Sequence, residues 1–382
     1  MKVLHVIRDM SVNTGGPVSF IKDLVRIQKK NGDEVVVITT DYDHARISID
    51  PDLISMFIFC RCQFRPLRFS SQLYKVLSEW ILWCDIVHIH TIWEYPTLVA
   101  AVIARRLGKP YLLRPCGMLV SWSMSQSAWK KYLYLKFFYK TLFLSPCVLH
   151  FMTEAEKRKS KVVAGRDSVV VESGVSEIAF WDHSKTDFLK YFPQLKESRI
   201  VLFLGRIHPK KNPDLVIRSF FQIVEMYPDA SLVIAGPGGK SYLQSLRELV
   251  ATLGISNKVF FVGPLKGGML YSAYHCASLF VLPSAQENFG LAVVEAMAAG
   301  CPVIVSDNVD IHKEIEQGGA GLVCPLHPKN IAIAMEKIIG DAAMGFNMGQ
   351  QGKKVARKYF SLEANYFRLK ETYIQIIERV QS

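Results

Sequence analysis

Short apolar runs alternate with amphipathic stretches along most of the chain. Seven runs in the first half are typical of strands that are buried on both faces of a parallel sheet: residues 2–7, 34–40, 57–60, 85–90, 110–115, 147–153 and 168–173. Stretches with a helical period lie between several of them, for example 17–30, 96–107 and 128–143. Because strands and helices alternate, the pattern predicts an α/β domain with a parallel sheet.

A polar segment near 182–198 interrupts this pattern, which then starts again. Six further apolar runs follow: 199–206, 231–237, 258–264, 278–284, 301–307 and 320–325. Two such series predict two doubly wound α/β domains, which we place at 1–180 and 199–360. The last stretch, 361–382, has a helical period and could cross back to the N-terminal domain. Ligands bind beyond the carboxyl ends of strands in such sheets, so we expect the site in a cleft between the domains.

Charge and composition narrow the possible partners. The net charge of the 382-residue chain is +12, and the first 180 residues carry +8 of it. An excess of positive charge favours nucleic acid, an acidic membrane or a phosphorylated substrate. Neither zinc-finger spacing nor an aromatic RNA-binding strand is present, so we expect no nucleic acid. There is no apolar run of 18 residues and no signal-peptide pattern, and the eight cysteines are scattered, which predicts a cytoplasmic protein with reduced thiols.

The segment QENFGLAVVEAMAAG carries the first chemical signal. It places Glu287 after a strand and Glu295 inside a helix that is expected from about Leu291 to Ala299, ended by Gly300. The free N–H groups near 289–291 could hold a phosphate, and carboxylates accept hydrogen bonds from vicinal sugar hydroxyls. The segment therefore suits a sugar–phosphate compound. The alternative is an ordinary helix with one surface glutamate and one glutamate favoured by the helix dipole.

The segment GRIHPKKNPD supplies two cations near the same predicted edge. Arg206 ends a strand, and Lys211 precedes a helix that Asn212 is expected to cap, with Pro213 in its first turn. Arginine can grip a diphosphate with two hydrogen bonds, and lysine adds a mobile charge. The alternative is a solvated basic turn, which is our interpretation of Lys210.

A glycine pair follows the first predicted strand. Gly15 and Gly16 open the first helix, where glycine lets the backbone approach a phosphate closely. The segment VNTGGPVSFI is neither a dinucleotide fingerprint nor a P-loop, so this signal is weak by itself.

Taken together, GRIHPKKN and ENFGLAVVEAMAAG closely resemble the retaining nucleotide-sugar glycosyltransferases of GT-B architecture, family four. The resemblance spans the chain and implies two Rossmann-like domains that face each other across a cleft, with 1–180 on the acceptor side and 199–360 binding the nucleotide sugar. The segments LLRPCGMLVSWSMS and HFMTEAEK are similar to a bacterial branch that builds surface polysaccharides. The implied activity is transfer of a hexosyl group from a nucleotide sugar to a glycan or lipid-linked acceptor.

The resemblance also implies roles for individual residues. Arg206 and Lys211 would bind the donor diphosphate, Glu287 would contact donor-sugar hydroxyls, and Glu295 would hold the ribose. The other implied donor-binding residues are Gly15, Gly16, Val262, Gly263, Phe289, Gly290 and Leu291. No metal and no cofactor are expected, because the cations and the helix N-terminus take that role. Since the acids are committed to hydroxyls, we favour substitution on the face from which the diphosphate leaves.

The chain departs from the family in one place. Many relatives carry His-Gly after the fifth strand, where this chain has Cys116, and we do not transfer the role of that histidine to it. His90 could face the acceptor, but a hydrogen-bonded histidine at a strand end is an equal alternative, and we expect His88 to be buried. Two other functions stay open: a nucleotide-sugar epimerase or phosphorylase of the same fold, and a non-catalytic sugar-nucleotide-binding subunit.

The segment from Trp129 to Lys140, WKKYLYLKFFYK, interleaves lysines with aromatic residues. With the positive N-terminal half, it suggests peripheral attachment to an anionic membrane surface at the inner leaflet. It has no purely basic face, so the alternative is an ordinary helix whose aromatic side chains enter the core.

Overall fold

The computed structural model describes residues 1–11, 14, 16–43, 49–144 and 147–381. The chain divides into two compact units, Met1–Gly174 with Leu362–Ser382, and Val175–Ser361. Val175 donates its N–H to the carbonyl of Phe360 at 2.8 Å and forms a parallel bridge with Ser361, which holds this segment to the second unit. Residues 175–180 therefore belong to the second unit, whereas the sequence analysis placed them in the first domain.

The first unit contains a seven-stranded parallel sheet in the order β3-β2-β1-β4-β5-β6-β7. Its strands are β1 (Lys2–Asp9), β2 (Glu34–Thr40), β3 (Phe57–Cys60), β4 (Ile86–His90), β5 (Tyr111–Arg114), β6 (Cys147–Phe151) and β7 (Ser168–Val170). Each lies within one of the seven predicted runs or extends it by up to two residues, so the predicted sheet is confirmed.

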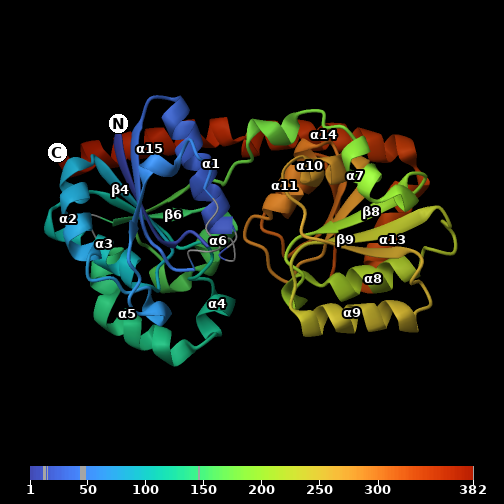
Figure 1. Cartoon of the computed structure of the whole chain (residues 1–382), viewed down its shortest axis with the longest axis horizontal. Coiled ribbons are helices and arrows are strands. Elements are labelled where there is room, and N and C mark those ends of the chain that lie inside the picture. The colour runs from blue at the N-terminus through green and yellow to red at the C-terminus, as the bar shows by residue number, and fades with distance from the viewer. Residues whose placement is uncertain (12–13, 15, 44–48, 145–146, 382) are drawn as a thin grey trace. The chain divides into compact units, whose positions relative to one another are not determined.

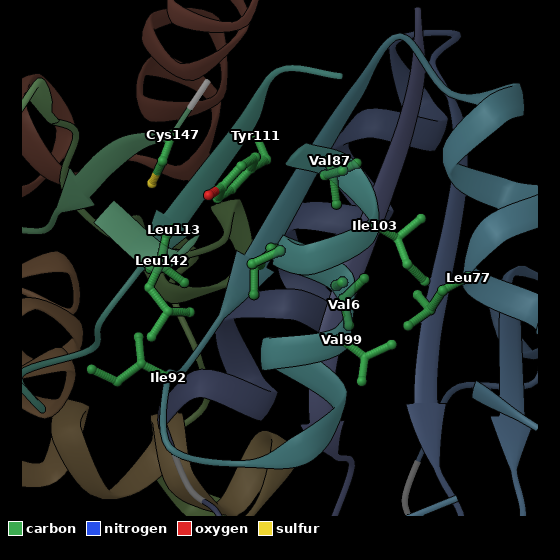
Figure 2. Packing of buried hydrophobic residues seen from close by; sticks show 14 of the residues in the cluster. Val6, Leu77, Val87, Ile92, Val99, Ile103, Tyr111, Leu113, Leu142 and Cys147 are labelled. Carbon is green, nitrogen blue, oxygen red and sulfur yellow. The ribbon is translucent and has the colours of Figure 1, made fainter. Parts of the chain in front are cut away.

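Helices cover both faces of this sheet (Figure 1). They are α1 (Gly16–Lys30), α2 (Leu73–Trp83), α3 (Tyr95–Arg106), α4 (Ser121–Ser125), α5 (Ala128–Phe143), α6 (Glu154–Lys159) and α15 (Leu362–Gln381). On one face α1 and α15 pack on residues such as Ile7 and Leu112. On the other face, the sheet residues Val87 and Leu113 pack against Val99 and Ile103 of α3 and against apolar side chains of α2 and α5 (Figure 2).

The second unit contains a six-stranded parallel sheet in the order β10-β9-β8-β11-β12-β13. Its strands are β8 (Arg199–Leu204), β9 (Ala230–Ala235), β10 (Val259–Gly263), β11 (Ala277–Leu282), β12 (Val303–Ser306) and β13 (Gly321–Cys324). Its helices are α7 (Thr186–Tyr191), α8 (Pro213–Phe221), α9 (Lys240–Thr252), α10 (Gly267–Cys276), α11 (Leu291–Ala298), α12 (His312–Gln317), α13 (Pro328–Gly340) and α14 (Ala342–Phe360). Each strand lies within one of the six predicted runs or begins one residue before it.

Short 3-10 helices complete the two units: η3 (Ile54–Met56), η4 (Arg65–Leu67), η5 (Lys161–Val163), η6 (Glu177–Phe180), η7 (Pro193–Leu195) and η8 (Pro209–Lys211). Within the described residues, no helix combines the length and apolar character needed to cross a membrane. All eight cysteines are free thiols, and Cys62, Cys116 and Cys276 are only half-buried.

Close backbone packing positions α11 in the second unit. Gly300 has a φ of +80° and follows α11 as the predicted left-handed terminating residue. A Cβ atom on Gly349 of α14 would lie 2.0 Å from the carbonyl oxygen of Gly300, and one on Gly352 would lie 3.4 Å from Met297. Only glycine therefore lets α14 approach α11 this closely.

Candidate functional site

Two loops at the carboxyl edge of the second sheet bring predicted residues together. Lys211 ends η8, which follows β8, and Glu287 lies in the loop after β11, the neighbouring strand. The Lys211 Nζ donates to Glu287 Oε2 at 2.5 Å, although the residues are 76 positions apart in the chain. Both side chains are about four-fifths buried, with 18% and 23% exposed, so this ion pair is largely shielded from solvent.

The two loops are tied by hydrogen bonds that the sequence did not indicate. The Asn212 Nδ2 donates to the carbonyl of Pro283 at 2.8 Å, and the N–H of Ala285 donates to the carbonyl of Lys210 at 2.8 Å. Asn212 has a φ of 50° and makes no side-chain cap, so the predicted capping role is wrong; its amide ties the loops instead. Lys210 is half-buried rather than solvated, and burial lowers its pKa.

The backbone around Glu287 is fixed on its other side. Its N–H donates to the carbonyl of Asn308 at 3.1 Å, and its carbonyl accepts from Asp310 at 2.9 Å. Gly290 has a φ of +78°, and a Cβ there would lie 3.4 Å from Glu287 Cγ and 3.2 Å from Val293 Cγ2. A larger residue would strain the backbone and press on the carboxylate.

The start of α11 offers unused backbone donors. The N–H groups of Phe289, Gly290 and Leu291 donate to none of the residues that the structure describes. The Phe289 side chain is buried and meets Phe360 edge to face, with ring centroids 5.4 Å apart, so its backbone is the part that can serve a ligand. Free N–H groups at a helix start bind anions or hydroxyl oxygens.

Glu295 is oriented by a residue that the sequence analysis missed. The hydroxyl of Tyr274, on α10, donates to Glu295 Oε2 at 2.9 Å. Tyr274 is completely buried, and burial raises its pKa well above the usual value, with Glu295 adding to the effect. The tyrosine therefore remains a hydrogen-bond donor and fixes the orientation of the Glu295 carboxylate. No motif in YSAYHCASLF marked this position.

Arg206 is the exposed cation of this edge. It follows Gly205 and makes no ion pair with any described residue. A Cβ on Gly205 would lie 3.4 Å from Lys211 Cδ, so the lysine stem runs along this glycine. A guanidinium without a carboxylate partner is available to an anionic group.

Val262 and Gly263 lie at the end of β10, the edge strand, with β9 between them and β8. Gly263 has a φ of +76° and accepts a hydrogen bond from the N–H of Gly236 at 2.8 Å. These two residues therefore line a different part of the carboxyl edge from the Lys211–Glu287 pair.

The predicted residues of the first unit have mixed placements. Gly16 begins α1 and is exposed, with open space where a Cβ would be, and Gly15 lies outside the described residues. His90 is completely buried, and its Nε2 lies 3.1 Å from His5 Nδ1. Of the two interpretations of His90, the hydrogen-bonded strand-end histidine matches this geometry. Cys116 is half-buried with a φ of 54°, and burial raises the pKa of its thiol.

The histidines of this sheet form the one grouping of described residues with metal-ligand distances. Ligand atoms of His5, His88 and His90 lie within 4.8 Å of one another. Ring nitrogens of these residues already bond one another, Gln28, Tyr373 and His150. Burial lowers the pKa of His88 and of His90, and the positive charge of Arg114 lowers both further. This arrangement fits neutral, mutually bonded imidazoles better than a cation site.

Comparison with known proteins gives two family matches. Residues 185–355 match the family described as glycosyl transferases group 1, and residues 15–171 match the glycosyl transferase 4-like domain. An uncharacterised glycosyltransferase of Methanocaldococcus jannaschii is 33% identical over 179 residues, 45% of this chain and 45% of that protein. A D-inositol 3-phosphate glycosyltransferase of Nocardia farcinica is 35% identical over 148 residues, 37% of this chain and 33% of that protein. The chain thus matches less than half the length of these curated relatives.

A solved structure has the same fold. The Anabaena protein HepE, in complex with UDP and glucose, aligns with a TM-score of 0.78 at 18% identity, covering 98% of this chain and 100% of that chain. This likeness confirms the predicted GT-B fold.

Proposed function

Because the chain belongs to the GT-B glycosyltransferases of family four, we propose that it moves a hexosyl group from a nucleotide sugar to a glycan or lipid-linked acceptor, with retention of anomeric configuration. The observation that carries the proposal is the Lys211–Glu287 pair at 2.5 Å, beside the unpaired Arg206 and the free N–H groups that start α11. Cations, a carboxylate and backbone donors together match a diphosphate linked to a sugar.

Each group has a role in this proposal. Arg206 and Lys211 bind the diphosphate and stabilise its charge as it leaves. Glu287 accepts hydrogen bonds from donor-sugar hydroxyls, and the free N–H groups before α11 bind sugar or phosphate oxygens. Glu295, held by Tyr274, accepts hydrogen bonds from the ribose hydroxyls. Val262 and Gly263 lie near the base.

The proposed reaction needs no protein nucleophile. The acceptor hydroxyl forms the new bond to the anomeric carbon on the face from which the diphosphate departs, and a diphosphate oxygen takes the hydroxyl proton. Glu287 and Glu295 are committed to hydroxyl groups of the donor in this proposal, so neither is free to attack. The protein contributes position and charge stabilisation. With two cations on the diphosphate, we propose that no metal is required, and activity should persist in EDTA.

A donor panel tests the proposal. The full chain is incubated with UDP-, GDP-, ADP- and dTDP-sugars and a bacterial lipid extract, and nucleoside diphosphate release is measured together with the anomeric configuration of any product by NMR. We expect release from one donor and a product with the donor's configuration. Inversion would overturn the retaining mechanism, epimerised donor would favour the epimerase, and binding without release would favour the non-catalytic subunit.

A second surface supports peripheral attachment to an anionic membrane. Large apolar side chains on α4 and α5 are exposed: Trp122 (52%), Trp129 (65%), Tyr132 (68%), Leu133 (43%) and Phe137 (72%). Lys130, Lys136 and Lys140 are exposed on the same helix, whereas Lys131 turns inward to the carbonyl of Ser123. Exposed aromatic rings beside lysines suit an anionic lipid surface, where the rings enter the interface.

Sedimentation with anionic liposomes tests this attachment. Each lysine near such a surface contributes about 1 kcal/mol, so changing Lys130, Lys136 and Lys140 to glutamate should weaken binding by at least about 100-fold. The matched control changes three exposed lysines elsewhere in the same unit, Lys30, Lys75 and Lys161, with the same charge difference. Equal losses in both triple variants would mean that net charge, not this surface, drives binding. Lack of binding by the wild type would remove the membrane from the proposal.

A further inference from the structure

The tripeptide His-Pro-Lys occurs twice in the second unit, each time at the start of a helix. His208 precedes η8 and His327 precedes α13, and both have an extended backbone, with φ of −149° and −141°. Each histidine Nδ1 accepts from the N–H of the lysine two residues later, at 3.1 Å from Lys210 and 3.3 Å from Lys329. Because the proline between them has no N–H, the imidazole caps the first free donor of the helix.

The cap at His208 is a large part of what holds η8, because η8 is a single turn. Two backbone hydrogen bonds close this turn. The N–H of Lys211 donates to the carbonyl of His208 at 2.8 Å, and the N–H of Asn212 donates to the carbonyl of Pro209 at 3.0 Å. Hydrogen bonds in 3-10 turns have poorer geometry than those in α-helices. The imidazole adds a third bond to these two, at the end of the turn where the chain enters it.

The same turn positions Lys211 in the candidate site. Lys211 is the last residue of η8, and its Nζ donates to Glu287 Oε2 at 2.5 Å. The carbonyl of Lys210 and the side-chain amide of Asn212 bond the loop after β11, on either side of Lys211. The end of the turn is thus anchored to the neighbouring loop, whereas its start is closed by His208. Loss of the imidazole bond should therefore loosen the start of the turn and displace Lys211.

This cap works in one charge state of the histidine. Because Nδ1 accepts the N–H of Lys210, the proton of neutral His208 lies on Nε2. A proton on Nδ1 would replace the acceptor by a second donor, and the bond would be lost. Partial loss of hydration lowers the pKa of His208, and the positive charges of Arg206 and Lys210 lower it further. The negative charges of Glu287 and Asp310, in the loops after β11 and β12, act on the neighbouring Lys210. The cap is therefore intact at neutral pH and is lost in acid.

We propose that His208 is a positioning residue: its neutral imidazole holds η8 so that Lys211 meets the diphosphate, and protonation of the ring releases the turn. This inference rests on the proposed function, because it takes Lys211 as a ligand of the diphosphate. His208 acts through the turn and not through contact with the substrate. The equivalent cap at His327 begins α13, which follows the edge strand β13, so it provides an internal comparison.

Ratios of kcat/KM at two pH values test the proposal. Sugar transfer by the full-chain wild type, His208→Ala and His208→Asn is measured at pH 7.5 and pH 5, with circular dichroism for the fold at each pH. Asparagine is a good cap whose side-chain oxygen accepts from the Lys210 N–H at either pH. At pH 7.5 the wild type and His208→Asn should each exceed His208→Ala by about 5-fold, the usual contribution of one N-cap expressed as a rate. At pH 5 the wild-type ratio should fall toward one, while the asparagine ratio stays unchanged.

A matched control and a readout without transfer make the result decisive. His327→Ala removes the cap of α13 and should keep wild-type kcat/KM at both pH values. Nucleoside diphosphate affinity, measured by calorimetry on the same proteins, reports the position of Lys211 and should give the same order of variants. Hydrogen exchange of peptides that cover 206–213 should match His208→Asn at pH 7.5 and His208→Ala at pH 5 in the wild type.

Three outcomes would overturn the role of His208. They are a wild-type-to-alanine ratio of one at pH 7.5, a ratio that is the same at both pH values, and an equal loss in His327→Ala. Absence of transfer from every donor, with the expected order of nucleoside diphosphate affinities, would refute the proposed function and support the positioning role.

Discussion

The two sheets differ in what they bury. In the first unit, His5, His88, His90 and His150 are buried inside strands, and Arg114 at the end of β5 is 2% exposed. The described strands of the second unit contain no buried histidine and no buried charged residue. The candidate site residues of the second unit thus lie mainly in loops beside an apolar sheet, whereas the first unit has polar side chains buried within its sheet.

The polar groups of the first sheet are connected across strands and to a helix. His88 Nδ1 lies 2.7 Å from the Tyr373 hydroxyl on α15, and His88 Nε2 lies 3.1 Å from His150 Nδ1. His150 Nε2 lies 2.8 Å from the carbonyl of Val171. Because these rings are buried in the neutral form, the stability of the first unit should depend on pH through groups that the second sheet lacks.

The largest effect is expected from removing the two cations in the loops of the second unit. Arg206→Ala and Lys211→Ala should each lower the rate of sugar transfer about 10²–10³-fold, since a lost charge-assisted contact to a developing anion costs roughly 2–4 kcal/mol. Initial rates of nucleoside diphosphate release, with circular dichroism for the fold, measure this. Exposed cations of the same unit, in Arg218→Ala and Lys240→Ala, serve as controls. Near-wild-type turnover in both site variants would refute the diphosphate assignment.

The next largest effect is a loss of stability at acidic pH in the first unit, which the second sheet should not share. Burial lowers the pKa of His5 from 6.5 to about 4 and that of His150 to about 3. Between about pH 6.5 and 4 the unfolded chain binds protons that the folded unit does not, so stability falls as pH falls. For His5 alone this amounts to about 3 kcal/mol. Urea unfolding at pH 7.5, 6 and 5 measures it, because five of the six tryptophans lie in the first unit.

The histidine origin of this pH dependence has its own control. His5→Gln removes one titrating ring and should make the slope of unfolding free energy against pH shallower below pH 6.5. His327→Gln changes an exposed histidine of the second unit and should leave that slope unchanged. A slope equal to wild type in His5→Gln would mean that carboxylates, not the buried imidazoles, govern acid unfolding.

The difference between the sheets also explains what the sequence could predict. All thirteen strands were readable, because a continuous apolar run is typical of a strand covered on both faces. Lys211 and Glu287 were readable because each follows such a run. Tyr274 and Asn212 were not: one orients Glu295 from another helix, and the other bonds Pro283 across 71 positions. His90 was a candidate site residue because the sequence alone does not show that His5, 85 positions earlier, lies beside it.

The next test concerns the close packing of α14 against α11 in the second unit. Gly349→Ala would place a Cβ 2.0 Å from the Gly300 carbonyl, so α14 must shift away from α11. Overpacking of this kind costs about 1–3 kcal/mol. Hydrogen exchange of second-unit peptides should rise while that of first-unit peptides stays the same. Gly239→Ala has no atom within 4 Å of the new Cβ and an ordinary φ, so it should change neither.

The smallest effect concerns the link between α15 and the first sheet. Tyr373→Phe removes the hydroxyl that bonds His88 Nδ1 at 2.7 Å, in a completely buried position. The His150 Nε2 donates to the carbonyl of Val171, so His150 Nδ1 accepts from His88 Nε2, and neutral His88 already carries its proton on Nε2. Loss of the Tyr373 hydroxyl therefore leaves an unpaired acceptor rather than an unpaired donor at His88 Nδ1. We therefore expect a loss of about 1 kcal/mol, at the low end for an unmade buried hydrogen bond. Tryptophan-detected urea unfolding at pH 7.5 measures it, with Tyr191→Phe, an exposed tyrosine of the second unit, as the control. A loss no larger than that of the control would mean that apolar packing by itself holds α15 against the sheet.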